Sequence, residues 1–318
     1  VRLDSLVQYK EAAELFLQAS VIDSMYADLQ FRLGRCYIKM KNISEAGKCF
    51  IKARDYDALR FRADSRINDI IRDVALNNNS GRIYLTDAWK DATNYCYDGI
   101  PGKELLLEHV HLNVSGNYFL AKCLLEKVEN ALNIESNLNT PDIDKCLERL
   151  AFTPFDNLRI QNEMIQRKIE PPFTNQISNA EDLQLSRKLA DELKTRVKNE
   201  LAAIDSIYIK QISFNSEDWF LHSNYLKFLF EYRKDFEAFR QAKTIYDMMP
   251  FDYFNSVNMG ITLLNLKHLT EAEQYLKQAV SINPLHPKAY NTLGVVQINQ
   301  NQPDEALNMG DSPASNTI

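Results

Sequence analysis

Ten residues, 108–117, bring together side chains that are capable of acid–base or metal chemistry. The segment reads EHVHLNVSGN and contains Glu108, His109 and His111, two of the five histidines in the 318-residue chain. An imidazole can take up a proton, release one or bind a metal ion, and a neighbouring carboxylate fixes which ring nitrogen carries the proton. The spacing is compatible with three kinds of site.

The first interpretation is the acid–histidine half of a hydrolytic site. Glu108 and His111 are three residues apart, so a turn can bring their side chains together. The carboxylate would then orient the imidazole, whose second nitrogen takes a proton from a serine nucleophile. In this interpretation His111 acts as general base and then as general acid, with Glu108 as its orienting partner.

Two further interpretations compete with it. His109 and His111 are two residues apart, so on an extended segment they point to the same side and can share a zinc or iron ion. That site needs a third ligand, and the other three histidines all follow residue 220. The last interpretation is structural: the segment begins a helix, with Ser115 or Gly116 at the cap.

The composition excludes several classes of protein. The net charge is −6 and no block of Lys and Arg occurs, which argues against nucleic acid and acidic membranes as partners. No run of eighteen apolar residues is present to span a bilayer. The five cysteines are scattered and lack a C-x-x-C spacing. We therefore expect reduced, partly buried cysteines rather than zinc ligands or disulfides, and no cofactor.

The N-terminal end carries an internal repeat with a period of about 34 residues. A Leu-Gly pair and a tyrosine precede a small–large–small series of side chains, and the same series occurs one period earlier. Such a series suits two helices that cross closely. The matched positions are Ala46, Phe50 and Ala53 in the later copy and Ala12, Phe16 and Ala19 in the earlier copy.

The C-terminal end repeats with the same period. Gly260 and Gly294 are one period apart, as are Pro250 and Pro284. These residues resemble the tetratricopeptide repeat, in which glycine allows close helix packing and proline closes the second helix. The copy that begins at Trp219 is degenerate, because leucine stands at the glycine position.

The resemblance implies a stack of helical hairpins that presents a concave groove to an extended peptide or a helix. Residues on the first helix of each repeat would line this groove. No cluster of Lys and Arg suited to a peptide carboxylate is present. A packing or spacer role without a ligand is the alternative. The expected groove residues are Asn265, Lys288, Asn291 and Asn299.

The rhythm of the repeats stops between residues 57 and 135. Ile67, Ile70, Ile71 and Val74 form the stripe of a helix that packs on one face. The run RIYLTDAW, residues 82–89, follows as a short expected strand, and a second periodic helix begins after the histidines. Helix, strand, loop and helix in this order are typical of the end of an α/β domain.

Residues 108–116 resemble the last conserved block of the SGNH (GDSL-type) esterases and lipases, roughly D-x-V-H-P-N-x-x-G. Glu108 replaces the aspartate and Leu112 the proline. The flanking stretches 57–68, 99–113 and 146–176 look like a bacterial subgroup that joins an SGNH hydrolase domain to tetratricopeptide repeats. The resemblance implies an ester hydrolase or acyltransferase that works through a serine acyl-enzyme.

The family's nucleophilic serine lies in an upstream G-D-S block, and no such block occurs between Val1 and His111. Ser65 sits in a helical pattern and follows no strand or glycine turn. Gly310-Asp311-Ser312 belongs to a polar tail that we expect to be disordered. We therefore expect a fragment that lacks the nucleophile block and has no esterase turnover by itself.

The sequence thus predicts a mainly α fold, with tetratricopeptide repeats at both ends of a partial α/β, SGNH-like segment. We expect a protein-interaction chain that carries the acid–histidine half of a serine hydrolase site, or alternatively a non-catalytic scaffold. Partners are a protein or peptide and, in the parent protein, an ester substrate. The cytoplasm is the favoured compartment, although a missing N-terminus could carry a membrane anchor or signal. The expected domains are repeats at 1–56, the SGNH-like portion at 57–135, a helical connector at 136–212, repeats at 213–309 and a tail at 310–318.

Overall fold

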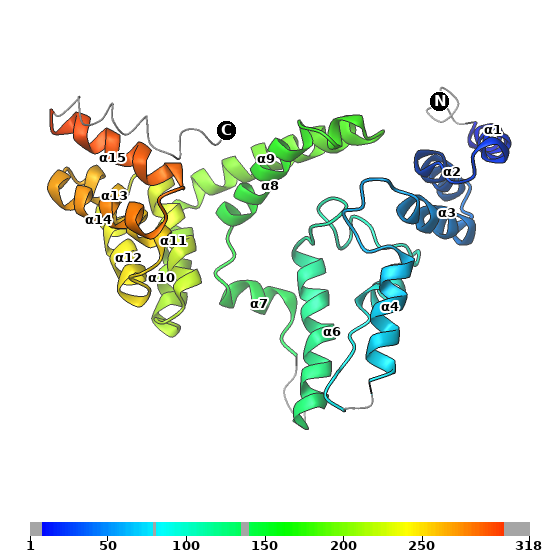
Figure 1. Ribbon diagram of the computed structural model, residues 1–318, viewed down its shortest axis with the longest axis horizontal. Coiled ribbons are helices and arrows are strands. Elements are labelled where there is room, and N and C mark those ends of the chain that lie inside the picture. The colour runs from blue at the N-terminus through cyan, green and yellow to red at the C-terminus, as the bar shows by residue number, and fades with distance from the viewer. Residues whose placement is uncertain (1–7, 79–80, 135–139, 302–318) are drawn as a thin grey trace. The chain divides into compact units, whose positions relative to one another are not determined.

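The computed structural model describes residues 8–78, 81–134 and 140–301, and its regular elements are helices (Figure 1). Within these ranges no β-strand forms, and the only β-type backbone pairing is one isolated antiparallel bridge between Leu106 and Leu112. The prediction of a mainly α fold is confirmed. The chain divides into two compact units, Val1–Ile143 and Asp144–Ile318, and this boundary falls inside the predicted connector. The finer domain limits stay a prediction.

Unit 1 begins with the N-terminal repeats. The ring of Phe50 fills the space beside Gly34, where an added Cβ would approach Phe50 Cε1 to 2.8 Å. A glycine is therefore needed for the close helix crossing that the sequence predicts, and Cys36 and Cys49 are buried in the small core around it. The helices of unit 1 are α1 (Tyr9–Ile22), α2 (Ala27–Lys39), α3 (Ile43–Asp55), α4 (Ser65–Leu76), α5 (Ala88–Tyr95) and α6 (Val114–Leu132).

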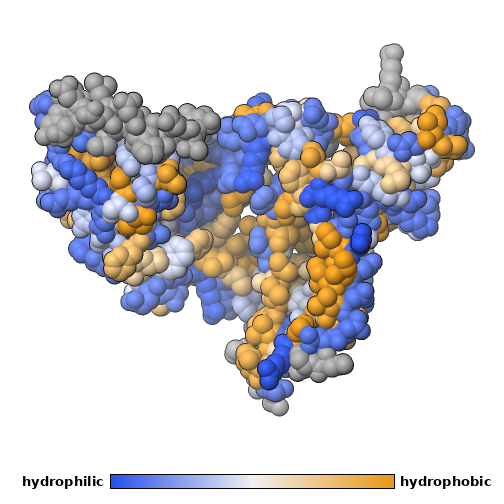
Figure 2. Space-filling view, viewed as in Figure 1, coloured by the Kyte–Doolittle hydropathy of each residue, from blue (hydrophilic) through white to orange (hydrophobic). Residues whose placement is uncertain are grey.

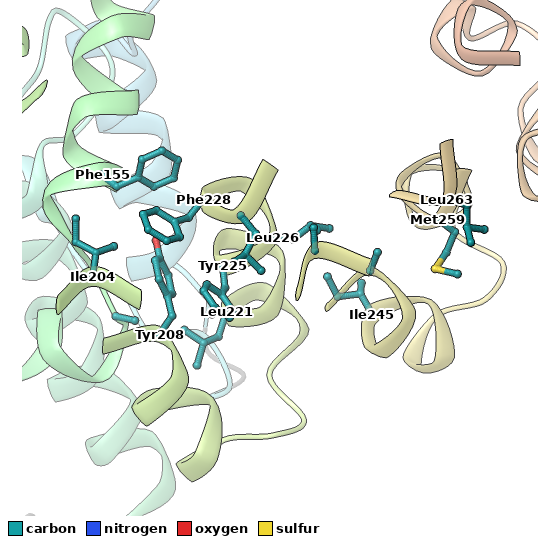
Figure 3. Packing of buried hydrophobic residues seen from close by; sticks show 14 of the residues in the cluster. Phe155, Ile204, Tyr208, Leu221, Tyr225, Leu226, Phe228, Ile245, Met259 and Leu263 are labelled. Carbon is teal, nitrogen blue, oxygen red and sulfur yellow. The ribbon is translucent and has the colours of Figure 1, made fainter. Parts of the chain in front are cut away.

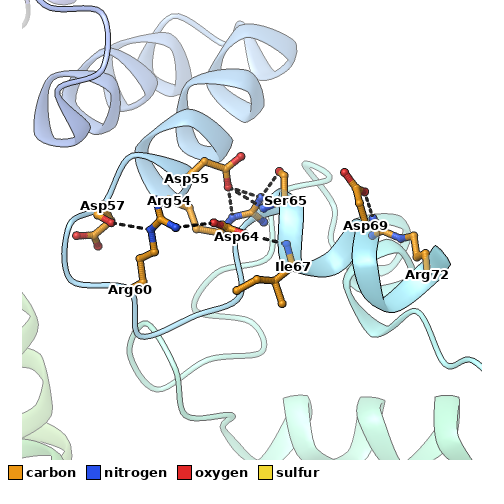
Figure 4. Close-up of polar contacts among 9 residues, drawn as sticks. All are labelled: Arg54, Asp55, Asp57, Arg60, Asp64, Ser65, Ile67, Asp69 and Arg72. Atoms are coloured by element: carbon orange, nitrogen blue, oxygen red, sulfur yellow. Dashed lines mark hydrogen bonds and ion pairs between the residues drawn. The ribbon is translucent and has the colours of Figure 1, made fainter. Parts of the chain in front are cut away.

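A polar cluster joins the end of α3 to the start of α4 (Figure 4). Arg54 donates to Asp55 Oδ1 at 2.7 Å and to Ser65 Oγ at 2.6 Å, and the Ser65 amide donates to the same Asp55 oxygen at 3.0 Å. Asp64 caps α4 by accepting the Ile67 N–H at 2.8 Å. These bonds lower the pKa of Asp55 although burial opposes the change. The cluster fixes how the chain leaves the N-terminal repeats.

The expected strand at residues 82–89 is wrong. Residues 82–87 have no regular structure, and α5 begins at Ala88. Asp87 caps α5 by accepting the Lys90 N–H at 3.1 Å and binds Arg72 of α4 at 2.7 Å. A strand requires a neighbour for its backbone hydrogen bonds, and none lies beside this run among the described residues.

Two helices of unit 1 leave their apolar stripes exposed. The predicted helix forms as α4, but none of its residues is buried, so the expectation that its stripe packs is wrong within the described ranges. Helix α6 likewise exposes leucines and a valine, and Figure 2 shows apolar side chains along both helices. The exposed residues are Ile67, Ile70, Ile71 and Val74 on α4 and Leu124, Leu125, Val128 and Leu132 on α6.

Unit 2 contains a continuous core that is shared by successive hairpins (Figure 3). Phe155 meets the edge of Phe228 with ring centroids 5.3 Å apart, and Tyr208 stacks on Tyr225 at 5.1 Å. The helices are α7 (Ile143–Arg149), α8 (Pro154–Lys168), α9 (Asn179–Asn199), α10 (Leu201–Phe214), α11 (Trp219–Glu231), α12 (Asp235–Met248), α13 (Tyr253–Asn265), α14 (Leu269–Ile282) and α15 (Pro287–Asn299), with a short 3₁₀ turn, η1 (Phe173–Asn175), between α8 and α9.

A buried polar group anchors α8 in this core. Asp156 Oδ2 accepts the Thr153 N–H at 2.9 Å, the Thr153 hydroxyl at 2.7 Å and the Tyr208 hydroxyl at 2.7 Å. Burial raises the pKa of Tyr208, so its hydroxyl stays protonated and remains a donor. The carboxylate is thus satisfied where an unpaired one would be costly.

The close helix crossing at the glycine position of the repeat is achieved with different residues in successive hairpins. In α13 an added Cβ at Gly260 would approach Leu276 Cγ of α14 to 2.5 Å. The equivalent positions in α11 and α12, one repeat earlier, are Leu226 and Ala242, and both are buried. A large residue on the first helix therefore accompanies a small one on the second. The α11–α12 copy, which the sequence suggests is degenerate, therefore preserves the total side-chain volume at the helix crossing.

Candidate functional site

The stretch around the two histidines forms a tight turn in front of α6. The Leu107 N–H donates to His111 O at 2.8 Å, and the Asn113 N–H donates to Leu105 O at 2.9 Å. Asn113 caps α6 by accepting the Gly116 N–H at 2.9 Å, so the cap is Asn113 rather than the expected Ser115 or Gly116. An added Cβ at Gly116 would collide with the Leu105 carbonyl oxygen, which explains the glycine.

The turn brings Glu108 and His111 together. The Glu108 side chain is only 5% exposed, and it accepts the backbone N–H groups of Val110 at 2.9 Å and of His111 at 2.8 Å. Its Oε1 also contacts Nδ1 of the His111 ring. Burial by itself would raise the pKa of Glu108, but these donors outweigh it and lower the pKa. The carboxylate is therefore held ionised beside an imidazole whose side chain is half exposed.

The second histidine turns toward the same carboxylate. Nδ1 of His109 lies 2.9 Å from Glu108 Oε2, and its ring packs against Phe61 with centroids 5.2 Å apart. Burial lowers the pKa of His109. Each histidine thus presents Nδ1 to a different oxygen of Glu108, and no group of three His, Cys, Asp or Glu side chains suited to a metal ion occurs within residues 8–78, 81–134 and 140–301.

Ser65 lies in the polar cluster that joins α3 to α4. Its hydroxyl is bound to Arg54 at the first residue of α4, as described above. The side-chain partner that the His111 ring has is Glu108. Ser312 of the G-D-S triplet lies outside the described residues.

The four predicted groove residues do not act alike. Asn265 donates to Asp235 Oδ1 at 2.9 Å, and so it ties the end of α13 to the start of α12. Asn299 donates to the Val295 carbonyl of its own helix at 2.7 Å. Lys288 and Asn291 are exposed on α15, so these two of the four can present their side chains to a ligand.

A different set of residues stands out on the same array. Five large apolar side chains, in the first turns of α11 and α13 and in the loops before α13 and α15, are between 50% and 85% exposed. Phe220 and Phe254 are one repeat apart, and so are Phe251 and Leu285. Their spacing was visible in the sequence, but it lies outside the positions that define the repeat. We call this set the apolar ladder: Trp219, Phe220, Phe251, Phe254 and Leu285.

The first turns that carry the ladder are firmly positioned. Asp218 caps α11 by accepting the Phe220 N–H at 3.0 Å, and Asp252 caps α13 by accepting the Asn255 N–H at 2.9 Å. The ring of Phe254 meets the edge of His286, which begins α15, at 5.4 Å. The first turn of α13 is therefore in direct contact with the start of α15 in the next repeat.

Comparison with known proteins agrees with the repeats at both ends. Models of the tetratricopeptide repeat family match residues 27–58 and residues 263–310. The chain thus carries tetratricopeptide repeats in each unit. No curated protein matches the chain.

Solved structures match at low similarity. MamA from Desulfovibrio magneticus RS-1 is 11% identical with a TM-score of 0.33, covering 48% of this chain and 91% of that one. The Cut9–Hcn1 hetero-tetramer of the APC/C is 16% identical with a TM-score of 0.33, covering 90% and 58%. The TPR2AB domain of yeast Sti1 with pHSP90 is 14% identical with a TM-score of 0.29, covering 98% and 84%. Similarity at this level assigns no ligand to the present chain.

Among the described helices, none combines the length and the apolar character that a bilayer crossing requires.

Proposed function

We propose that this chain is a protein-interaction scaffold whose C-terminal repeats dock a partner through the apolar ladder. The observation that carries this proposal is the exposure of Phe251 and Phe254, together with their equivalents one repeat away. Single exposed apolar residues are ordinary on a protein surface, but large exposed apolar side chains at equivalent positions of successive repeats, as in the pairs Phe220 and Phe254 and Phe251 and Leu285, are not. Aromatic side chains are also the residues that contribute most to binding energy at interfaces.

The rigid setting of the ladder favours this role. The rings stand on helix turns that are capped by Asp218 and Asp252 and held by the core beneath them. Binding of a partner to these rings costs little conformational entropy of the scaffold, because the turns are already ordered. The same exposure has no use in the fold itself, since these side chains contribute little to the buried core.

Selection from a random peptide library displayed on phage, with the full chain as bait, tests this proposal. Enriched peptides should bind the wild type and lose at least tenfold in affinity to the Phe220→Glu/Phe254→Glu variant. Phe236→Glu is the matched control, because Phe236 is equally exposed but lies on α12, outside the ladder. Enriched peptides that bind the ladder variant as well as the wild type would contradict the proposal.

A second candidate function is the acid–histidine half of an SGNH-type serine hydrolase or acyltransferase site. The contact between Glu108 Oε1 and His111 Nδ1 favours it, since it leaves Nε2 as the nitrogen that accepts a proton from a nucleophile. His111 would be the general base and Glu108 the orienting carboxylate. The chain itself is expected to show no esterase turnover, so p-nitrophenyl acetate hydrolysis should be unchanged by His111→Ala.

The tautomer of His111 tests this second candidate directly. Nitrogen-detected NMR of the imidazoles should place the proton of neutral His111 on Nδ1, and Glu108→Gln should reduce this preference. An Nε2–H tautomer in the wild type would rule out the general-base role.

A further inference from the structure

We infer that the apolar ladder takes an extended peptide segment with a large apolar side chain at every third residue and basic residues between them. This inference rests on the proposed docking function and specifies the chemistry of the partner. It follows from the spacing of the ladder, from the way each repeat contributes to it, and from the charges beside it.

The spacing comes from the packing of the repeats. Phe254 of α13 contacts His286 at the start of α15, so the first turns of these two successive repeats are adjacent. Packed helices lie about 8–10 Å apart. An extended chain in the polyproline II conformation advances about 3.1 Å per residue with three residues per turn, so every third side chain points to the same face and three residues span about 9 Å. A peptide that runs along the ladder therefore meets one repeat with every third side chain.

Each repeat contributes a separate contact rather than part of a continuous trough. Phe251 comes from the loop before α13 and Phe254 from its first turn, and the next repeat offers Leu285 and the stem of Lys288 at the same two positions. Discrete contacts of this kind suit side chains that are engaged one by one. A helical ligand instead needs a groove that receives a whole face.

The charges beside the ladder are mainly negative. Glu217, Asp218 and Asp252 are exposed at its loops, and Lys288, the α15 residue equivalent to Phe254, is the opposing cation. The two aspartates partly serve the N-termini of their own helices, which leaves Glu217 as the carboxylate most available to a ligand. Lysine or arginine in the peptide would find complementary charge here, whereas a terminal carboxylate would find a single lysine.

Fluorescence polarisation with four labelled synthetic peptides and the full chain tests the inference. The first carries Phe at every third residue with Lys and Ser between. The second replaces Lys with Glu, the third places the Phe residues side by side, and the fourth is a helix with Phe at every seventh residue. The first peptide should bind at least tenfold more tightly than the other three. Phe251→Ala/Phe254→Ala should remove this preference, and Phe236→Ala should preserve it.

The outcomes separate the partner's chemistry from the docking function. If another of the four peptides binds as tightly as the first, and its binding still requires Phe251 and Phe254, the inferred chemistry is wrong while docking on the ladder stands. If the first peptide binds most tightly but equally well to Phe251→Ala/Phe254→Ala, the inference is overturned because the ladder is not its site. If no peptide, synthetic or selected, depends on these two residues, both proposals are overturned. The variants change exposed side chains only, so thermal unfolding should match the wild type.

Discussion

The C-terminal repeats and helices α4 and α6 use the same apolar periodicity with opposite results. In unit 2 the stripes of successive helices meet and bury residues such as Leu229 and Ile245 completely or nearly so. In unit 1 the stripes of α4 and α6 remain exposed across the described residues. The difference teaches that periodicity predicts a helix and its apolar face, while burial depends on whether a second stripe is available to cover that face.

The largest expected effect measures this contrast directly. Leu229→Ala should cost about 3–4 kcal/mol of unfolding free energy, because it opens a cavity in a filled core. Leu125→Ala on α6 should cost less than about 0.5 kcal/mol, since that side chain is already exposed. Urea unfolding of single-tryptophan variants follows each unit, with Trp219 reporting unit 2 and Trp89 reporting unit 1. Equal losses at the two leucines would contradict the contrast.

The exchange of large and small residues between hairpins gives the next largest effect. Gly260→Leu and Leu276→Ala should each destabilise unit 2, the first by overpacking and the second by a cavity. The double variant recreates the arrangement of Leu226 and Ala242, so it should recover about 2 kcal/mol relative to the sum of the single losses. Urea unfolding measures these free energies. The control double variant combines Gly260→Leu with the distant Leu201→Ala, and its loss of unfolding free energy should equal the sum of the two single losses.

The repeats could be predicted from the sequence because their packing partners are close together in the chain. Gly34 and Gly260 each precede by sixteen positions the large side chain that needs the space, so one hairpin contains both partners. Leu226 reads as a defect only when the second helix is ignored, since its compensating Ala242 also lies sixteen positions on. Checking both members of each pair would have identified the exchange.

The predictions that were wrong or incomplete depend on contacts between segments, which a single sequence does not show. Ile83 and Tyr84 are good strand formers, but a strand requires a neighbour that the described chain does not place there. Asn265 matches a groove position by analogy, whereas its bond to Asp235 arises only in the folded hairpin pair. The Glu108–His111 contact was predicted from spacing because a short turn determines it.

A smaller effect is expected at the buried carboxylate of α8. Tyr208→Phe removes a donor to Asp156 without changing the packed volume, so unit 2 should lose about 1.5 kcal/mol. Tyr97→Phe serves as the control, because the Tyr97 side chain is exposed in unit 1 and should contribute nothing measurable. Chemical denaturation of the two variants checks the prediction, and an unchanged midpoint for Tyr208→Phe would refute the role of this bond.

The smallest effect is a pH dependence confined to unit 1. The folded state lowers the pKa of Glu108, so its contribution to stability is present above the unfolded value of about 4.3 and is lost as the pH falls through the folded value. Glu108→Gln should therefore flatten the loss of unit 1 stability below about pH 5. Trp89 fluorescence in the Trp219→Phe background records this, with Glu104→Gln as the matched control. A profile as steep as the wild type's would show that Glu108 does not contribute to this loss.

Calorimetric titration of the full chain with its tightest selected peptide tests the central claim most directly. Wild type and Phe236→Glu should bind with the same dissociation constant, while Phe220→Glu/Phe254→Glu should bind at least tenfold more weakly. That result would locate docking on the apolar ladder of the C-terminal repeats. Equal affinity of all three proteins would contradict it.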